Sequence, residues 1–267
     1  MKTASRIYTF LVFLFLYAPI IVLIIFSFNS STSTSTFAGF SLKWYQSILH
    51  DSTSLRALCN TLILAVCSSA TATVLGTAAA VGLDKYKKSA FRTSIMATTN
   101  IPMMNPEIVT GISMMLLFVF LGKIIRVESV LGFGTLLIAH VTFDLPYVIL
   151  TVLPKLKQTD RNLAEAAQDL GCKPFSAFMK VVLPAIMPAI LTGLIMSFTL
   201  SLDDFIISYF TGGPGFQTLP IVIFSMTKKR VKPDMYALSA LIFVSILVLL
   251  ILYNIVQEKS ESKNKSN

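Results

Sequence analysis

The chain alternates between long apolar stretches and shorter polar ones. Six apolar stretches have the length of roughly 20 residues that a helix needs to cross the hydrocarbon core of a bilayer. The first is too long for the apolar region of a signal peptide and lacks a clear cleavage site, so we expect an uncleaved anchor. The pattern predicts an all-α integral membrane protein: one domain, residues 1–257, with spans at about 7–28, 58–83, 101–121, 130–153, 184–210 and 235–256, and a disordered polar tail, 258–267.

The amino-acid composition supports a membrane protein. Only 13% of the residues are charged and 54% are hydrophobic, whereas a typical soluble domain has about 25% charged residues. So few charges would not cover the surface of a soluble protein of this size. We therefore expect the lipid bilayer to cover much of the surface.

The formal net charge of +9 indicates orientation rather than nucleic-acid binding. Lys and Arg are spread over short loops and form no basic arm or stripe, so no nucleic-acid partner is expected. They are more numerous near the two termini and in the loop after the fourth span. The positive-inside rule therefore places both termini and this loop in the cytoplasm, although the basic segment 228–232 lies on the other side. The three cysteines suggest no disulfide framework and no metal site.

The loop at 159–183 has the pattern of a helix–turn–helix outside the membrane. Glu165 falls in an early helical turn, where a carboxylate suits the helix dipole. Gly171 is placed as a left-handed helix stop, and Pro174 suits the first turn of a second helix. That helix carries apolar residues at i, i+3, i+4 and i+7. Periodicity alone fits either a surface for a partner protein or an amphipathic loop resting on the membrane.

This loop resembles the "EAA" signature of bacterial ABC importer permeases. The matching residues are the Glu-Ala-Ala triplet at 165–167, the glycine four residues later and the Leu-Pro pair at 183–184. The resemblance implies a type I ABC importer permease fold, in which coupling helices dock into a cleft on a partner ATPase. The coupling residues it implies are Glu165, Ala166, Ala167, Gly171, Phe175, Phe178, Met179, Leu183 and Pro184.

The sequence contains no G-x-x-x-x-G-K-[ST] phosphate-binding loop. We therefore expect a translocation subunit that is not an enzyme, has no catalytic residues and binds no cofactor. A partner ATPase would bind and hydrolyse ATP with Mg²⁺.

Further segments are similar to spermidine/putrescine importer permeases of the PotC type. They include "NPEIVTGIS" at 105–113, "SFTLSLDDFIISYFTGGPGFQTLP" at 197–220 and "VKPDMYALSAL" at 231–241. The resemblance implies a sister permease subunit forming a heterodimer, an ATPase homodimer and an extracytoplasmic polyamine-binding protein, assembled at the bacterial plasma membrane. Alternatives are a permease for another organic cation or small solute, and a proton-coupled secondary transporter.

Four carboxylates fall within the expected spans: Glu107, Asp144, Asp203 and Asp204. Acids inside a membrane usually face a bundle interior or a watery cavity, so they are candidates for a cation pathway. Helical spacing puts Asp204 on a small, polar face with Gly193, Ser197, Ser201 and Ser208, and puts Asp203 about 100° away. Spacing does not decide which aspartate meets a cation. Pro102 and Pro106 can break the start of the third span beside Glu107, and Asp144 can pair with His140.

Aromatic residues near these acids could stack on a cation. For this pathway we consider Tyr147, Phe205 and Tyr209, and we assign Trp44 and Tyr45 to docking of the binding protein. The aromatic belts of membrane interfaces would explain most of these positions equally well.

Overall fold

The structure is a computed structural model that describes residues 2–32, 36–85, 90–127, 130–160, 162–228 and 233–265. The described residues are helical, apart from turns, loops and one isolated β-bridge between Asn29 and Phe40. The chain divides into two compact units. One comprises Met1–Ala57 and Ile221–Leu252, and the other comprises Leu58–Pro220 and Tyr253–Asn267.

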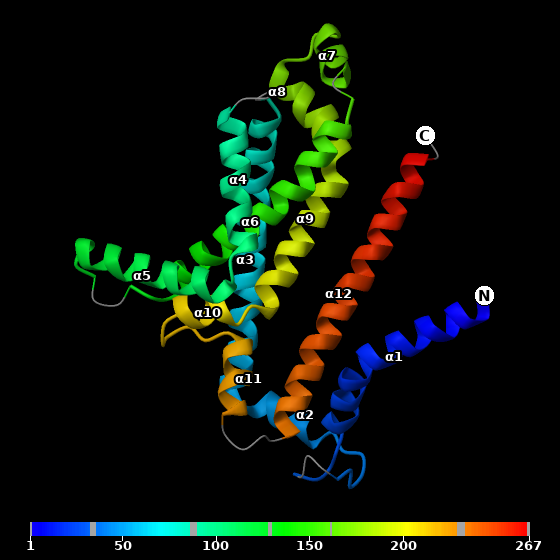
Figure 1. Ribbon diagram of the computed structural model, residues 1–267, viewed down its shortest axis with the longest axis vertical. Coiled ribbons are helices and arrows are strands. Elements are labelled where there is room, and N and C mark those ends of the chain that lie inside the picture. The colour runs from blue at the N-terminus through cyan, green and yellow to red at the C-terminus, as the bar shows by residue number, and fades with distance from the viewer. Residues whose placement is uncertain are drawn as a thin grey trace. The chain divides into compact units, whose positions relative to one another are not determined.

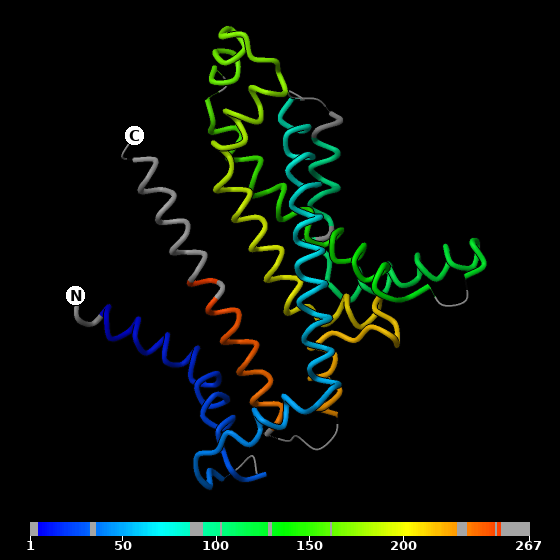
Figure 2. The backbone as a smooth tube through the Cα atoms, turned by 180° about the vertical axis from the view of Figure 1, so that it is seen from behind, coloured from blue at the N-terminus to red at the C-terminus, as the bar shows by residue number. Residues whose placement is uncertain are grey.

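The second unit is built around three helices that run side by side, as Figures 1 and 2 show: α3 (Ser52–Lys85, most of it in this unit), α6 (Phe133–Gln158) and α9 (Leu183–Asp203). Small residues allow this close approach. A Cβ atom at Gly76 would lie 2.7 Å from the Cβ of Val148, and one at Gly193 would lie 3.4 Å from the Val148 Cα. The small-residue face predicted for the fifth span is therefore a packing face between α9 and α6.

The third expected span begins later than predicted. Helix α4 (Ala90–Met104) ends before Pro106, and α5 (Glu107–Ile125) begins directly after it. Pro106 has an extended ψ of 132° and no backbone N–H, so it cannot continue α4 but can open α5. Pro102, by contrast, lies within α4. In Figures 1 and 2, α5 leaves the direction of α3, α6 and α9 at a wide angle.

The first unit contains α1 (Lys2–Ser27), α2 (Lys43–His50), most of α11 (Leu219–Thr227) and the first part of α12 (Pro233–Lys265). Trp44 is only 7% exposed, and its indole N–H donates to the Asn29 carbonyl at 2.6 Å. The hydroxyl groups of Tyr45 and Ser27 lie 2.7 Å apart. These contacts hold α2 against the end of α1. The docking role assigned to Trp44 does not fit, because its side chain is buried within the unit.

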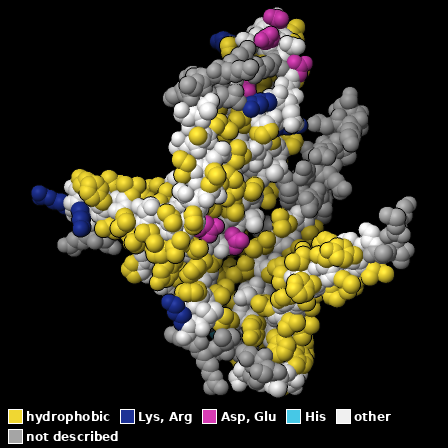
Figure 3. Space-filling view, in the orientation of Figure 1, with side chains coloured by type: hydrophobic (Ala, Val, Ile, Leu, Met, Phe, Trp, Pro, Cys, Tyr) yellow, Lys and Arg dark blue, Asp and Glu magenta, His cyan; other side chains and the backbone are white. Residues whose placement is uncertain are grey.

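Five helices among the described residues are long and apolar enough to cross a membrane: Ser5–Ser27, Ser52–Lys85, Glu107–Ile125, Phe133–Gln158 and Pro174–Asp203. The expected sixth span corresponds to a shorter apolar part of α12, Asp234–Val248. Large apolar side chains stay exposed on α1 and α5, for example Phe15 at 81% and Ile125 at 69%, and Figure 3 shows extensive hydrophobic surface. Lipid or partner subunits would cover such surface.

The tail predicted to be disordered differs from the structure. Helix α12 continues through Lys265, and only residues 266–267 of the tail lie outside the described residues. The tail is polar but contains no Pro or Gly, and Glu261 precedes Lys265 by four residues, a spacing that favours a helix. Polarity alone was therefore a poor guide to the end of the helix.

Candidate functional site

The fifth expected span is broken at the aspartate pair. Helix α9 ends at Asp203, and α10 (Ile206–Thr211) begins after two residues. Asp204 has an extended backbone with ψ 124°, so the helix cannot continue through it. Its carboxylate then accepts hydrogen bonds from the backbone N–H groups of Ile207 at 3.2 Å and Ser208 at 2.7 Å. Asp204 thus caps α10 and supplies partners for N–H groups that a broken helix leaves free.

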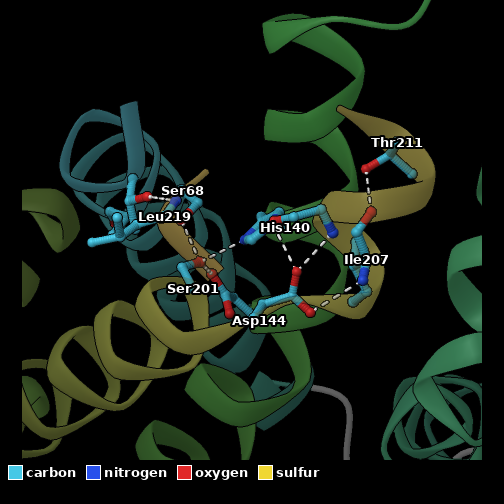
Figure 4. Close-up of polar contacts among 11 residues, drawn as sticks. Ser68, His140, Asp144, Ser201, Ile207, Thr211 and Leu219 are labelled. Carbon is cyan, nitrogen blue, oxygen red and sulfur yellow. Dashed lines mark hydrogen bonds and ion pairs between the residues drawn. The ribbon is translucent and has the colours of Figure 1, made fainter. Parts of the chain in front are cut away.

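Asp204 belongs to a buried polar cluster between α3, α6, α9 and α10, shown in Figure 4. His140 of α6 lies at its centre and is 1% exposed. Its Nε2 lies 3.4 Å from Asp204 Oδ2 and 3.0 Å from the Ser208 hydroxyl oxygen. Its Nδ1 lies 3.0 Å from the hydroxyl oxygen of Ser201. Both ring nitrogens therefore have polar partners, and these partners lie on opposite sides of the helix break.

Asp144 is connected to the same cluster through Ser201. The Ser201 hydroxyl donates to Asp144 Oδ2 at 2.8 Å and lies 2.6 Å from the hydroxyl oxygen of Ser68 on α3. Asp144 is fully buried, and its Oδ1 forms no hydrogen bond to the described residues. The expected pairing with His140 is therefore indirect, because both side chains bond to Ser201.

The surroundings of Asp203 and Glu107 differ from those of the buried Asp204 and Asp144. Both side chains are exposed. Asp203 is the last residue of α9, and Glu107 is the first residue of α5. Their carboxylates are close enough to interact electrostatically, and the Tyr147 side chain is also close enough to Glu107 for an electrostatic interaction. Acids in membrane spans are candidates for a cation pathway, so this exposed pair stays a candidate site.

Aromatic rings lie on the segment that follows Asp203. The ring centroids of Phe205 and Tyr209 are 5.6 Å apart, and Tyr209 is 51% exposed. Tyr147 packs against Phe143 at a centroid distance of 5.6 Å. Such rings can contact methylene groups or stack on ammonium groups. The exposed acids and these rings together suit a ligand with positive charges and an apolar chain.

The loop after α6 has the predicted helix–turn–helix form, with α7 (Asn162–Asp169) followed by α8 (Pro174–Ala177). Gly171 has φ +88°, its N–H donates to the Gln168 carbonyl at 2.8 Å, and the N–H of Cys172 donates to the Ala167 carbonyl at 3.0 Å. This pattern is a Schellman stop, and it confirms the left-handed glycine. Pro174 occupies the first turn of α8, as predicted.

The exposure of the loop side chains separates two faces. Glu165 and Ala166 are exposed and Phe175 is 71% exposed, whereas Ala167 is buried at 9%. Phe178 and Val182 line a cavity of about 630 Å³ between the loop and the ends of α3 and α6. Residues 178–182, which contain Met179, form a π-helix that leads into α9 at Leu183 and Pro184. Ala167 therefore packs inside the loop and does not itself face outward.

Sequence reasoning missed the central position of His140, which we considered only as a partner for Asp144. A signal was present, because His140 and Asp144 are four residues apart and share one face of α6. The serine face of the fifth span was also predicted, but the helical wheel was extended through Asp204, where the helix ends.

Comparison with known proteins identifies the family. Residues 72–265 match the model of the "binding-protein-dependent transport system inner membrane component". The chain belongs to this family of membrane permeases. It is 40% identical over 206 residues to the putrescine transport system permease protein PotI of Escherichia coli (strain K12), covering 77% of this chain and 73% of that protein. It is 39% identical over 231 residues to the spermidine/putrescine transport system permease protein PotC of the same strain, covering 86% and 83%.

Solved structures show the fold of this permease. A bacterial ABC transporter involved in the import of the acidic polysaccharide alginate superposes with a TM-score of 0.75 at 17% identity, covering 97% of this chain and 95% of that chain. The MetNI methionine ABC transporter superposes with a TM-score of 0.62 at 16% identity, covering 77% and 95%. The predicted fold class, that of ABC importer permeases, is confirmed. These likenesses establish the fold alone.

Proposed function

We propose that this permease is the membrane-spanning subunit of an ATP-driven polyamine importer. The observation that carries the proposal is the exposed pair Asp203 and Glu107 beside aromatic rings, in a chain about 40% identical to permeases for putrescine and spermidine. Polyamines are flexible alkyl chains with several ammonium groups. Carboxylates would replace the water that these groups lose, and apolar or aromatic walls would contact the methylenes.

The polyamine would pass through alternating access. An extracytoplasmic binding protein delivers the cation to the face that carries Asp203 and Glu107. A partner ATPase homodimer binds ATP with Mg²⁺ and moves the coupling loop, and a sister permease completes the pathway as a heterodimer. In this arrangement both termini and the coupling loop are cytoplasmic, and the chain itself makes no covalent chemistry.

The coupling loop supports the docking of an ATPase. Its rigid glycine stop displays Glu165, Ala166 and Phe175 on an exposed surface. The cavity of about 630 Å³ beneath it leaves room for the loop to shift against α3 and α6. Exposed apolar residues on short helices are what the helix-in-groove mode of recognition uses.

Reconstituted transport tests the proposed substrate. We expect proteoliposomes containing the permease, its sister subunit and the ATPase, supplied with the binding protein and ATP, to accumulate labelled spermidine and putrescine. Unlabelled polyamine should compete, whereas an unrelated monovalent cation such as choline should not. Accumulation of another solute in place of polyamines would change the proposed cargo. Accumulation that survives without ATP but collapses with a proton ionophore would indicate a secondary transporter.

Substituting glycines tests the coupling loop. Gly171→Ala places a side chain at φ +88° and should strain the turn by about 1 kcal/mol, so we expect ATP hydrolysis and uptake to become uncoupled. Gly134→Ala is the matched control, because nothing lies within 4 Å of an added Cβ there and no positive φ is involved. Glu165→Ala should weaken binding of the ATPase in a pull-down. Intact coupling in both loop variants would argue against ATPase docking at this loop.

A further inference from the structure

His140 contacts both sides of the break between α9 and α10. Its Nδ1 lies 3.0 Å from the hydroxyl oxygen of Ser201, in the last turn of α9. Its Nε2 lies 3.0 Å from the hydroxyl oxygen of Ser208, in α10, and 3.4 Å from Asp204 Oδ2. The ring itself belongs to α6, a helix that does not take part in the break. One side chain of a neighbouring helix therefore fixes the two halves of the broken span.

The break needs such support because the carboxylate at its centre is buried. Asp204 is only 9% exposed, and an unpaired buried carboxylate is costly. Within the part of the chain that the structure describes, His140 is the only side chain within ion-pair distance of Asp204. A second contact from α6 holds the other end of α10, where the Thr135 hydroxyl donates to the Thr211 carbonyl at 2.9 Å. Helix α6 thus anchors α10 at both ends.

The anchored break determines how Asp203 lies relative to Glu107. Asp203 is the last residue of α9, and its neighbour Asp204 turns inward to cap α10. Helix α10 packs closely on α5, because a Cβ added at Gly111 would lie 3.1 Å from the Phe210 ring, and Glu107 is the first residue of α5. If Asp204 lost its partner, α9 could continue past its present end or the cap could open. Either change would move α10, and with it α5 and Glu107, relative to Asp203, so the exposed acid pair depends on a buried contact.

We propose that His140 is a positioning residue for Asp203. Through Asp204, Ser201 and Ser208 it holds the helix break in the form that presents the Asp203 carboxylate beside Glu107. The effect on transport rests on the proposed function, whereas the effect on the geometry of the break does not.

Two conservative variants separate the two contacts of the ring. The side-chain amide of Gln reaches the position of Nε2, and that of Asn reaches the position of Nδ1. His140→Gln should keep the contact with Asp204 and Ser208, and we expect it to retain uptake within about threefold of wild type. His140→Asn should keep only the contact with Ser201, and we expect it to lower uptake per assembled complex by about tenfold, the factor expected for one lost hydrogen bond to a charged group.

A double-mutant cycle tests whether His140 acts through Asp203. In the Asp203→Asn background, His140→Asn should cause little further loss of uptake, because the carboxylate that it positions is already absent. Two results would overturn the proposal. One is a loss of uptake in the double variant equal to the product of the losses in the two single variants, and the other is wild-type uptake by His140→Asn. Either result would make His140 an ordinary packed residue.

A readout without substrate keeps the inference separate from the proposed function. In a chain without Cys59, Cys67 and Cys172, the modification rate of Asp203→Cys by a thiol reagent reports the orientation of this position. We expect His140→Asn to change this rate at least fivefold and His140→Gln to change it less than twofold. Lys123→Cys, at an exposed polar position in the last turn of α5, is the control and should react at the same rate in all backgrounds.

The two assays have separable outcomes. A changed modification rate in a complex that imports no polyamine would support the positioning role and overturn the proposed substrate. An unchanged rate in a complex that imports polyamine would overturn the positioning role and leave the proposed function intact. If His140→Asn fails to assemble, both assays are compared between His140→Gln and wild type. Equal uptake together with different modification rates of Asp203→Cys would contradict the proposal.

Discussion

Asp203 and Asp204 are neighbours in the chain, yet their surroundings are opposite. Asp204 is buried, caps α10 and lies 3.4 Å from His140. Asp203 is exposed and lies within electrostatic range of Glu107. A helix break separates the two environments within one residue. Two neighbouring acids in one apolar span can therefore have opposite surroundings, one bonded inside the protein and the other exposed on its surface.

The largest effect should follow removal of both exposed charges. We expect Asp203→Asn combined with Glu107→Gln to lower ATP-driven spermidine uptake about 100-fold, since each lost charge-assisted hydrogen bond costs about 1.5 kcal/mol or more. The melting temperature of the complex should stay within about 2 °C of wild type, because surface charges contribute little to stability. Lys123→Gln, which removes an exposed charge in the last turn of α5, is the control and should leave both quantities unchanged. Wild-type uptake in the double variant would show that the exposed pair is not on the pathway.

The next largest effect should come from the buried partner. Asp204→Asn removes one charge of a buried pair and one acceptor of the cap, and we expect it to destabilise the permease by about 3 kcal/mol. Thermal unfolding of the purified complex in detergent measures this loss. If Asp204→Asn melts like wild type while polyamine uptake disappears, Asp204 rather than Asp203 faces the cation.

Asp144 should be much less sensitive than Asp204. It is equally buried, but it accepts its hydrogen bond from the Ser201 hydroxyl, which can donate to an amide oxygen as well as to a carboxylate. We expect Asp144→Asn to change the stability by no more than about 1 kcal/mol. A loss as large as that of Asp204→Asn would mean that the cluster requires the charge of Asp144.

A similarly small effect should come from Asp51, a carboxylate outside the membrane spans. It caps α3 by accepting from Thr53 and Ser54, and hydrogen bonding by the Ser54 hydroxyl lowers the pKa of its side chain. A lowered folded pKa means that the cap stabilises the protein at neutral pH and that this contribution is lost as the pH falls through the folded pKa. We expect Asp51→Ala to cost about 1 kcal/mol at pH 7. The cost should shrink in acid, and a cost that does not change with pH would contradict the charged cap.

The sequence predicted these regions unequally. The coupling loop was predicted well, down to the left-handed Gly171 and the first-turn Pro174, because local stereochemistry decides helix stops and starts. The prediction of a helical membrane protein followed from the lengths of the apolar stretches. The roles of Asp203 and Asp204 did not follow, because a helical wheel assumes an unbroken helix, and the break depends on His140 from 64 residues away. The docking role predicted for Trp44 does not fit for a similar reason. Its side chain is held by the carbonyl of Asn29, 15 residues away, and helix periodicity does not reveal this contact.

The most direct test of the account compares Asp203→Asn with Asp204→Asn in one preparation. The measurement is spermidine imported per ATP hydrolysed, expressed per folded complex. We predict that Asp203→Asn folds like wild type and lowers this ratio about tenfold, whereas Asp204→Asn lowers the amount of folded complex more than Asp203→Asn does. Equal ratios for wild type and Asp203→Asn, with normal folding of both, would contradict the assignment of Asp203 to the cation pathway.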